Sequence, residues 1–450
     1  MVKTTLSHMQ TNKKDVLGFL NTLLRPKKTE KKKYGEVFTP LTLVDHMLDM
    51  LPKDVWTNPH LKWLDPCVGI GNFMVSIYYR LMEGLKKTIR DETARHNHIL
   101  QKMLFMIELN PKNVHLCKIV FRGQSEREKE IELRSKNNMS DNSGISFINI
   151  IGGDALKVDT KEAWGIEKFD IVIGNPPYND SSTNRGAGHT LWTKFLLRSF
   201  DVWLKPESGL LCFVTPSLWR QVKHPLLTKM KEKTLLRLSI NDEEKGRKMF
   251  SCGTRFDVYL VKNATNIKKT KTLIDDQDGK KVRVYLNSWS FLPNGMYEEI
   301  AGLLPSDDEE RCAIIHDRSA YGTDKPHVQI KKTKEFKFPV IYSIDKAGQL
   351  TLQWTNTQEY GHFGIEKLVF RRMGLNRTPF IAAHSDNGDK ALTEWCFAFV
   401  APKHEHRKMK DMLKTDKMSR IIRAIALRSE INVKVLKEFR AYFWEDVENI

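Results

Sequence analysis

The sequence predicts an α/β protein in which a doubly wound, mostly parallel sheet is followed by a second domain of mixed α/β structure. Two observations carry this expectation. From about residue 61 to residue 262, short apolar runs alternate with stretches of helical periodicity, and strands that alternate with helices are typical of βαβ units. Beyond about residue 280 the patterns are shorter and strand-rich, and Gly, Pro, Asn and Asp interrupt them.

The elements of the first domain follow one another in a regular order. The expected strands lie within residues 61–65, 103–108, 145–154, 169–174, 209–216 and 256–263. The long gap between Phe73 and Glu108 implies a lengthened helix or an extra turn near residues 84–100. We expect the last run to be the antiparallel edge strand that such sheets often carry. A polar stretch over residues 263–281 then marks the domain boundary.

The chain is strongly basic. Its 73 Lys and Arg against 55 Asp and Glu give a formal net charge of +18 over 450 residues. This surplus favours a polyanionic partner, with an ordinary basic protein as the alternative. Residues 1–33 carry nine basic and two acidic side chains, and residues 401–440 carry twelve and five, so each segment is +7. In the second segment apolar residues recur at helical spacing, so we expect a core stripe and a basic outer face.

We therefore divide the chain into three parts: a basic lead-in over residues 1–33, an α/β domain over 34–265 and a further domain over 280–450. No apolar run reaches the 18 or so residues that span a membrane, and the N-terminus has no signal-peptide pattern. The six cysteines are scattered without a CxxC pair. We expect free thiols in a reducing, cytoplasmic compartment, and no metal site.

Acidic residues follow three of the expected strands. Asp65 ends the first strand and precedes a turn with Gly69 and Gly71, while Glu108 ends the second and Asp154 the third. In an open α/β sheet, ligands bind outside the carboxyl ends of the strands. A carboxylate there can accept hydrogen bonds from ribose hydroxyls or an adenine amine, and the sequence has neither a GxGxxG nor a GK[ST] phosphate loop. Together these features predict a site for a nucleoside-like cofactor, although each alone could be an ordinary turn or a solvated acid.

The fourth strand ends in Asn175-Pro176-Pro177-Tyr178. The two prolines lack an N–H, fix φ and push the preceding residue toward an extended conformation. The tip therefore presents a side-chain amide, carbonyl oxygens and an aromatic ring. The Asn175 side-chain oxygen and the Pro176 carbonyl can each accept an N–H bond from a planar amine, and Tyr178 can stack on its ring.

These motifs, in this order, resemble the S-adenosylmethionine-dependent, adenine-specific (N6) DNA methyltransferases of the gamma arrangement, as found in restriction-modification systems. The resemblance covers roughly residues 34–262 and implies a Rossmann-like methyltransferase sheet. It also implies that residues 280–450 form a DNA target-recognition domain. By this resemblance the cofactor-binding residues are Thr39 and Pro40 of "YGEVFTP", Asp65, Pro66, Gly69, Gly71 and Phe73 of "DPCVGIGNF", and Glu108, Asp154 and Asn175.

The same resemblance assigns further roles. It implies that "MFSCGTRF" provides an aromatic residue that contacts an extruded base, and we assign this role to Phe250 with Phe256 as the second choice. "EKLVFRRMG" is similar to basic strand-turns that such domains use near DNA. Arg371, Arg372 and Arg377 are therefore our candidate DNA contacts, with ordinary surface arginines as the alternative.

The tetrapeptide alone leaves the substrate open. Methyltransferases that act on RNA bases or on protein glutamine side chains use similar tips, and a cytosine amine is chemically close to that of adenine. We favour the adenine of double-stranded DNA because of the "FTP" segment and the basic second domain. A DNA-binding module without catalysis is less favoured because no expected site residue is missing. Only 33 residues precede "YGEVFTP", so we expect a modification enzyme whose restriction endonuclease would be separately encoded. The expected mechanism is direct attack of the amine on the sulfonium methyl, without a covalent intermediate or a metal.

Overall fold

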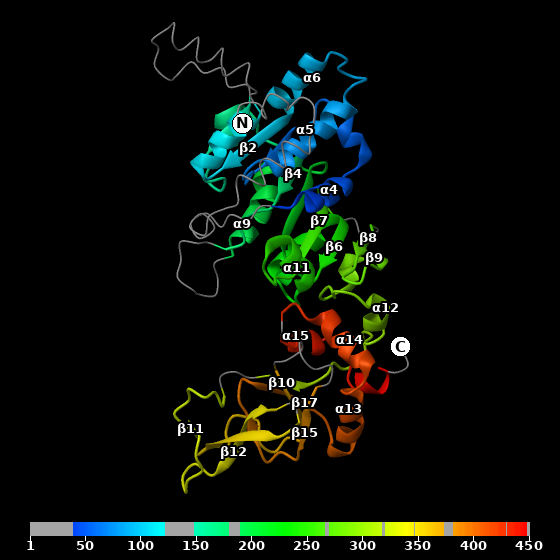
Figure 1. Cartoon of the computed structure of the whole chain (residues 1–450). Coiled ribbons are helices and arrows are strands. Elements are labelled where there is room, and N and C mark those ends of the chain that lie inside the picture. Colours follow the sequence, from blue (N-terminus) through cyan, green and yellow to red (C-terminus); the bar gives the residue numbers. More distant parts are fainter. Residues whose placement is uncertain are drawn as a thin grey trace. The chain divides into compact units, whose positions relative to one another are not determined.

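The computed structural model describes residues 39–121, 148–179, 190–265, 270–316, 320–345, 347–372, 381–428 and 430–447. The chain forms two compact units (Figure 1). We call them the N-terminal unit (Met1–Ser217, Thr228–Asp275 and Arg283–Asn287) and the C-terminal unit (Leu218–Leu227, Asp276–Val282 and Ser288–Ile450). The candidate DNA contact Arg377 and the lead-in over 1–33 lie outside the described residues.

A mixed sheet forms the centre of the N-terminal unit. Within the described residues it has nine strands in the order β3-β2-β1-β4-β5-β7-β6-β8-β9. Their bounds are β1 (Trp63–Asp65), β2 (Leu104–Glu108), β3 (Asn149–Gly152), β4 (Ile171–Gly174), β5 (Leu210–Pro216), β6 (Lys233–Asn241), β7 (Phe256–Thr265), β8 (Thr272–Asp275) and β9 (Lys281–Val284).

The first five strands are parallel, and their order reverses between β1 and β4. Strand β1 pairs with β2 on one side and β4 on the other, and these pair in turn with β3 and β5. The carboxyl ends of the strands at such a reversal are where doubly wound sheets bind ligands. The expected doubly wound α/β fold is confirmed.

Helices cover this sheet and begin or end where the sequence dictates. Helix α5 (Asn72–Gly84) starts at Gly71, whose left-handed φ of 95° caps the helix, and it buries Phe73, Ile77 and Leu81. The other described helices are α4 (Leu41–Asp49), α6 (Glu92–His98), residues 111–121, α8 (Thr160–Trp164), α9 (Leu191–Arg198), α10 (Pro225–Glu232) and α11 (Glu243–Phe250). Helix α6 and a π-helical turn at Ile99–Met103 account for the long spacing before β2.

The expectation of an edge strand over residues 256–263 is wrong. Strand β7 is antiparallel to β5, but β6 pairs with its other side, so β7 is interior. Strand β6 was not expected because polar residues such as Arg237 and Ser239 interrupt its apolar pattern. Likewise β8 lies within the polar stretch over 263–281, where it pairs in parallel with β6. Burial against neighbouring elements selects these strands more than their local sequence does.

The C-terminal unit contains two four-stranded sheets among its described residues. One has the order β10-β17-β14-β15 and the other β11-β13-β12-β16. The strands are β10 (Ile314–Ile315), β11 (Val328–Gln329), β12 (Phe338–Ile344), β13 (Leu350–Thr355), β14 (Lys367–Arg371), β15 (Ala383–Asp386), β16 (Ala391–Leu392) and β17 (Cys396–Val400). Side chains from both sheets share one apolar cluster, which includes Ile341, Val369 and Ala398.

Short helices complete the C-terminal unit: α12 (Tyr297–Ala301), α13 (His406–Met412), α14 (Asp416–Ile425) and α15 (Val433–Leu436). Helix α14 begins at Thr415, whose side chain accepts a hydrogen bond from the Met418 amide. It buries Ile421, Ile422 and Ile425, which confirms that the apolar stripe in this basic segment is core.

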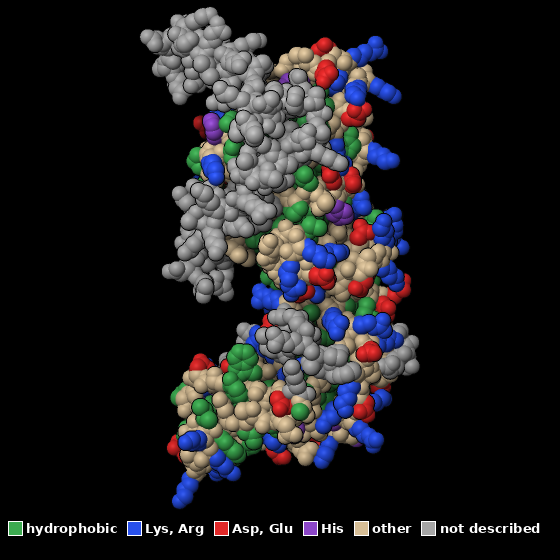
Figure 2. Space-filling view, in the orientation of Figure 1, with side chains coloured by type: hydrophobic (Ala, Val, Ile, Leu, Met, Phe, Trp, Pro, Cys, Tyr) green, Lys and Arg blue, Asp and Glu red, His purple; other side chains and the backbone are tan. Residues whose placement is uncertain are grey.

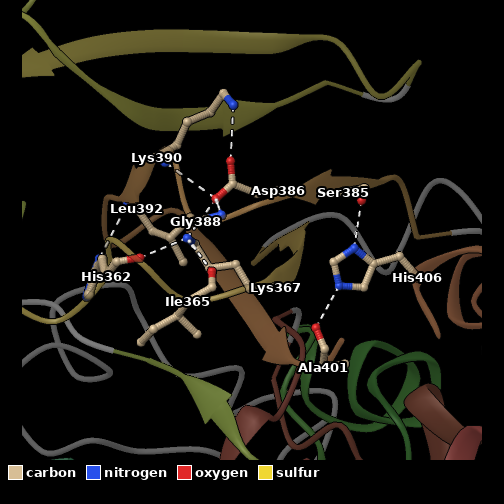
Figure 3. A network of polar contacts seen from close by, with 10 residues as sticks. All are labelled: His362, Ile365, Lys367, Ser385, Asp386, Gly388, Lys390, Leu392, Ala401 and His406. Atoms are coloured by element: carbon tan, nitrogen blue, oxygen red, sulfur yellow. Dashed lines mark hydrogen bonds and ion pairs between the residues drawn. The ribbon is translucent and has the colours of Figure 1, made fainter. Parts of the chain in front are cut away.

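A buried ion pair joins the strands of the first of these sheets (Figure 3). The Nζ of Lys367 on β14 lies 2.7 Å from Oδ2 of Asp386 on β15, and both side chains are fully buried. Lys367 also donates to the carbonyls of His362 and Ile365, while Lys390 lies 3.1 Å from the other Asp386 oxygen. Burial alone would raise the pKa of Asp386, but the bonds from the two lysines outweigh it and hold the pKa below its usual value.

Each of the six cysteines is a free thiol, as expected. No helix in the described part of the chain combines the length and the apolar character needed to cross a membrane.

Both ring nitrogens of His406 lie within hydrogen-bond distance of protein oxygens, namely Ser385 Oγ at 2.6 Å and the Ala401 carbonyl at 2.9 Å (Figure 3).

The buried pair gives a testable prediction for the C-terminal unit. Asp386→Ala leaves the Lys367 ammonium buried without its partner, which typically costs about 3–5 kcal/mol. We expect hydrogen exchange of the β14 and β15 amides to accelerate accordingly. Asp389→Ala, an exposed position three residues away, is the control and should change stability by less than about 0.5 kcal/mol. Equal protection in the two variants would contradict the role given to the pair.

Candidate active site

The site lies at the carboxyl edge of the parallel strands in the N-terminal unit. Asp65 ends β1, Glu108 ends β2, and Asn175 directly follows β4. The strand pairing brings these ends to one edge, because β1 pairs in parallel with both β2 and β4. The sheet therefore collects side chains that are 110 residues apart in sequence from Asp65 to Asn175.

The glycine-rich turn after β1 is tied to the acid that ends β2. The amide of Gly69 donates to Glu108 Oε2 at 2.8 Å, and that of Asn110 to Oε1 at 2.7 Å. Both Gly69 and Gly71 have positive φ, at 57° and 95°, where other residues are strained. The Glu108 carboxylate thus holds the turn in place. A ligand bound against the turn would also lie near this carboxylate.

Asp65 is a buried acid with a free acceptor. Its side chain is fully buried. Oδ1 accepts the Cys67 amide at 3.0 Å, while Oδ2 has no hydrogen-bond partner among the described residues. Burial raises the pKa of Asp65 to about 8, and the charge of Glu108 adds to the rise. A buried polar atom without a partner is costly and often marks a ligand position.

Strand β4 can approach this acid only because residue 174 is glycine. A Cβ built at Gly174 would lie 2.8 Å from Asp65 Oδ1, closer than any ordinary contact. The close approach sets the position of the residue that follows. Asn175 is therefore held beside the end of β1 by the backbone itself.

Thr39 connects the tip of β4 with the start of α5. Its hydroxyl accepts a hydrogen bond from Asn175 Nδ2 at 3.1 Å, and its carbonyl accepts one from Asn72 Nδ2 at 2.9 Å. The Asn175 Oδ1 atom is buried and has no partner among the described residues. With its amide nitrogen engaged, the Asn175 side chain is oriented so that its oxygen is the free acceptor.

The rest of the tetrapeptide is pinned at its far end. The Tyr178 carbonyl accepts a hydrogen bond from the Leu191 amide at 3.0 Å, at the start of α9. Pro176 is buried, whereas Pro177 and Tyr178 are partly exposed. Burial of the Tyr178 hydroxyl raises the pKa of this phenol, with Cys252 and Asp257 as further contributions, so it stays protonated at neutral pH.

Phe250 and Phe256 pack edge to face, with ring centroids 5.1 Å apart. Phe250 keeps 9% of its surface exposed and Phe256 only 1%. The preceding residue, Met249, has its sulfur 4.0 Å from Thr42 Oγ1, two residues beyond Pro40. Phe250 therefore lies near the "FTP" segment, and its role toward a base stays a prediction.

Other sequence-predicted residues are less closely joined to the site. Asp154 follows β3, is about 40% exposed, and accepts the Leu156 amide at 3.0 Å, a local bond within its own turn. Phe73 is core, with 4% exposed. Pro66 is buried directly after Asp65, and Pro40 begins α4.

The structure adds residues that no sequence pattern singles out. Asn72 bridges to Thr39 and keeps a buried oxygen without a partner among the described residues. Ser217, which directly follows β5, donates to the buried Asp257 of β7 at 2.8 Å. Asn72 stands inside the glycine-rich motif, but a polar residue at a helix start is too common to be a signal.

In the C-terminal unit the candidate DNA contacts Arg371 and Arg372 have different surroundings. The Arg372 Nε and Nη2 atoms lie 2.7 and 2.6 Å from Glu430 Oε2, so this guanidinium is already paired. The pair lines a cavity of about 440 Å³ that Arg428 and Lys434 also border. Arg371 ends β14 and is partly exposed.

Part of this chain is similar to known proteins. Residues 102–250 match the family model described as Eco57I restriction-modification methylase. Over 237 residues the chain is 31% identical to an uncharacterized adenine-specific methylase of Mycoplasma pneumoniae, a match that takes in 41% of this chain and 55% of that protein. The matched part of the chain is thus similar to restriction-modification methylases. The chain spans about half the length of the curated relative it matches.

Solved structures agree on the fold. The type IIL restriction-modification enzyme MmeI, in complex with DNA, aligns over 94% of this chain and 69% of its own, with a TM-score of 0.55 and 11% identity. The ATP-dependent type ISP enzyme LlaBIII, bound to DNA, aligns over 97% of this chain and 41% of its own, with a TM-score of 0.50 and 11% identity. The α/β fold is thus confirmed. The resemblance inferred from the motifs is confirmed by the family model and the relative.

The contact between β4 and β1 can be tested with one methyl group. Gly174→Ala places Cβ against the buried Asp65 carboxylate, and such overpacking typically costs about 1–3 kcal/mol. We expect a lower unfolding temperature of the N-terminal unit. Gly152→Ala is the matched control, because its Cβ would meet only Val114 at 3.5 Å. Equal unfolding temperatures for the two variants would refute the steric argument.

The raised pKa of Asp65 predicts a dependence of stability on pH. The folded state keeps the proton up to about pH 8, whereas the unfolded chain releases it near pH 4. The free energy of unfolding should therefore fall as pH rises from about 4 to about 8, by at most about 1.4 kcal/mol per pH unit from this group.

The measurement is urea denaturation of ligand-free protein at several pH values. Asp65→Asn should remove this part of the slope, and the exposed control Asp54→Asn should not. An unchanged slope in Asp65→Asn would contradict the assignment.

Proposed function

We propose that this protein is a site-specific DNA adenine methyltransferase that transfers a methyl group from S-adenosylmethionine to the exocyclic amine of an adenine extruded from duplex DNA. One observation carries the proposal. At the carboxyl end of β4, Asn175 has its amide nitrogen held by Thr39 while its buried oxygen lacks a partner among the described residues. That oxygen is an acceptor prepared for an amine.

The neighbouring residues fit S-adenosylmethionine. The cofactor would supply an electrophilic methyl group on a sulfonium. Asp65 Oδ2 is a buried carboxyl oxygen without a partner in the described part of the chain, and the Glu108 carboxylate lies at the positive-φ turn. We assign cofactor binding to these two acids and to Thr39, Pro40, Pro66, Gly69, Gly71, Phe73, Asp154 and Asn175.

In this proposal the chain acts by positioning and by hydrogen bonding. The Asn175 oxygen, with the Pro176 carbonyl, accepts the N–H bonds of the target amine and favours a more nucleophilic nitrogen. Tyr178 and Phe250 stack against the extruded base, as enzymes that act on single bases require. The Tyr178 phenol stays protonated, because burial raises its pKa, so it places no negative charge beside the base.

Charge supports duplex DNA as the substrate. The chain carries a net +18, and both aligned structures, MmeI and LlaBIII, were solved with DNA. Helices α13 and α14 and the turn between them expose Arg407, Lys414, Arg420 and Arg423, and Lys and Arg side chains gather over the C-terminal unit in Figure 2. We propose residues 34–265 as the catalytic domain and 280–450, with Arg371, Arg372 and Arg377, as the target-recognition domain. A separately encoded restriction endonuclease would complete the system.

The central test replaces the proposed acceptor. Asn175→Ala should lower single-turnover methyl transfer to duplex DNA by roughly 10²–10³-fold, the effect of removing one preorganised hydrogen-bonding group. Its dissociation constant for S-adenosylmethionine should change much less, because Asp65 and Glu108 remain. Asn58→Ala, at an exposed turn, is the control. Near-normal transfer by Asn175→Ala would refute the mechanism.

The substrate class needs its own measurement. Labelled S-adenosylmethionine is offered with duplex DNA, RNA and protein, and mass spectrometry identifies the modified base. We expect N6-methyladenine in DNA. Transfer only to RNA or to glutamine, or a product on cytosine, would replace the proposal.

A further inference from the structure

The C-terminal unit contains a basic loop that lies outside the motifs described above. Residues 330–337 connect β11 to β12. Both of these strands pair with β13, since Gln329 lies opposite Trp354 and Phe338 lies opposite Thr355. The loop therefore passes from one side of β13 to the other near Trp354 and Thr355.

The backbone of this loop is fixed by its own hydrogen bonds. The Thr333 amide donates to the Phe336 carbonyl at 3.1 Å, and the Phe336 amide donates to Thr333 Oγ1 at 3.0 Å. The Gln329 side chain adds bonds to the Lys331 carbonyl and to Thr333 Oγ1. An ordered loop presents its side chains with less entropy left to lose on binding.

Four of the eight side chains in the loop are lysines. Lys331, Lys332, Lys334 and Lys337 are exposed, and no ion pair to any of them is found within the described residues. The one acid, Glu335, accepts a hydrogen bond from Asn356 at 3.3 Å. Four positive charges and one negative charge leave +3 in eight residues. Figure 2 shows Lys and Arg side chains projecting near β11 and β12.

Aromatic rings support two of these lysines. Lys332 Nζ lies 4.8 Å from the centroid of the Trp354 ring, and Lys337 Nζ lies 5.1 Å from that of Phe338. Such an interaction restrains a long side chain without neutralising its charge. Elsewhere many surface lysines have a carboxylate nearby, such as Lys408 with Glu445 at 2.8 Å. The loop thus presents four ammonium groups, two of them restrained by aromatic rings. Such a set can bind a regular row of anions.

We propose that loop 330–337 is an arm that contacts the phosphate backbone of duplex DNA. The inference rests on the proposed function in taking DNA as the substrate. Lysine is a point charge that binds phosphate without the planar fork that arginine uses to read guanine. The arm therefore contributes affinity and orientation, with no preference for sequence.

The experiment compares two triple variants of the full chain by their salt-dependent DNA binding. Lys331→Ala, Lys334→Ala and Lys337→Ala together remove three charges of the arm and leave Lys332 on Trp354. The control combines Lys53→Ala, Lys87→Ala and Lys102→Ala, which removes the same charge from exposed positions. Lys102 precedes β2 and Lys87 follows α5, so these lie toward the amino edge of the sheet, away from the site.

We expect the slope of log K against log salt concentration to fall in magnitude by about 2–3 in the arm variant, near 0.9 for each phosphate that the arm no longer neutralises. The reduction should be the same on any duplex sequence, and the control should change by less than about 1. An arm variant with the slope of the control overturns the proposal. So does a reduced slope seen on double-stranded RNA but not on DNA.

Methyl transfer by the wild-type protein separates this inference from the proposed function. If wild type methylates DNA and the arm variant keeps its slope, only the arm is refuted. If wild type transfers no methyl group to DNA, the proposed function fails, and the DNA-binding slopes still decide the arm.

Discussion

The approach of β4 to β1 is the constraint on which the candidate site depends. Because residue 174 has no side chain, the β4 backbone passes directly beside the buried Asp65 carboxylate. The next residue, Asn175, then falls within 3.1 Å of Thr39, which also holds Asn72 at the start of α5. One missing methyl group thus sets the position of an acceptor and of a buried acid together. A looser approach would leave both oxygens open to water.

This arrangement lowers the free energy of unfolding of the ligand-free protein. Asp65 is fully buried with one oxygen that lacks a protein partner in the described chain, and burial raises its pKa to about 8. Asn175 and Asn72 each keep a similar buried oxygen. Groups of this kind lower the stability of a fold unless something else satisfies them. Their concentration at one sheet edge is the pattern expected of a preorganised binding site rather than of a packing surface.

Much of the candidate site could be predicted from the sequence, because its residues stand at strand ends that short sequence patterns identify. Parallel strands bring their carboxyl ends to one edge, so Asp65, Glu108 and Asn175 could be grouped from strand order alone. The Asn-Pro-Pro-Tyr tip is recognisable because two prolines exclude both helix and ladder. The roles of Asn175, Phe250 and Asp154 toward a ligand remain predictions, since the structure fixes their surroundings and not their partners.

The remainder depends on tertiary contacts that leave no local pattern. Strand β6 mixes Arg237 and Ser239 with apolar residues, and only its pairing with β7 and β8 makes it a strand. Lys367 reads as a surface lysine in a basic segment, yet it is fully buried against Asp386.

The arginines and lysines of the C-terminal unit show why counting charges is not enough. Arg372, predicted from its motif to meet DNA, is engaged by Glu430, so its charge is partly cancelled before any partner arrives. The lysines of loop 330–337 belong to no motif, but hydrogen bonds order their loop, and none of them forms an ion pair within the described residues. A polyanion responds to the charge that remains after internal pairing. Which surface a polyanion can bind therefore depends on the fold, because neighbouring side chains either neutralise a cation or leave its charge unpaired.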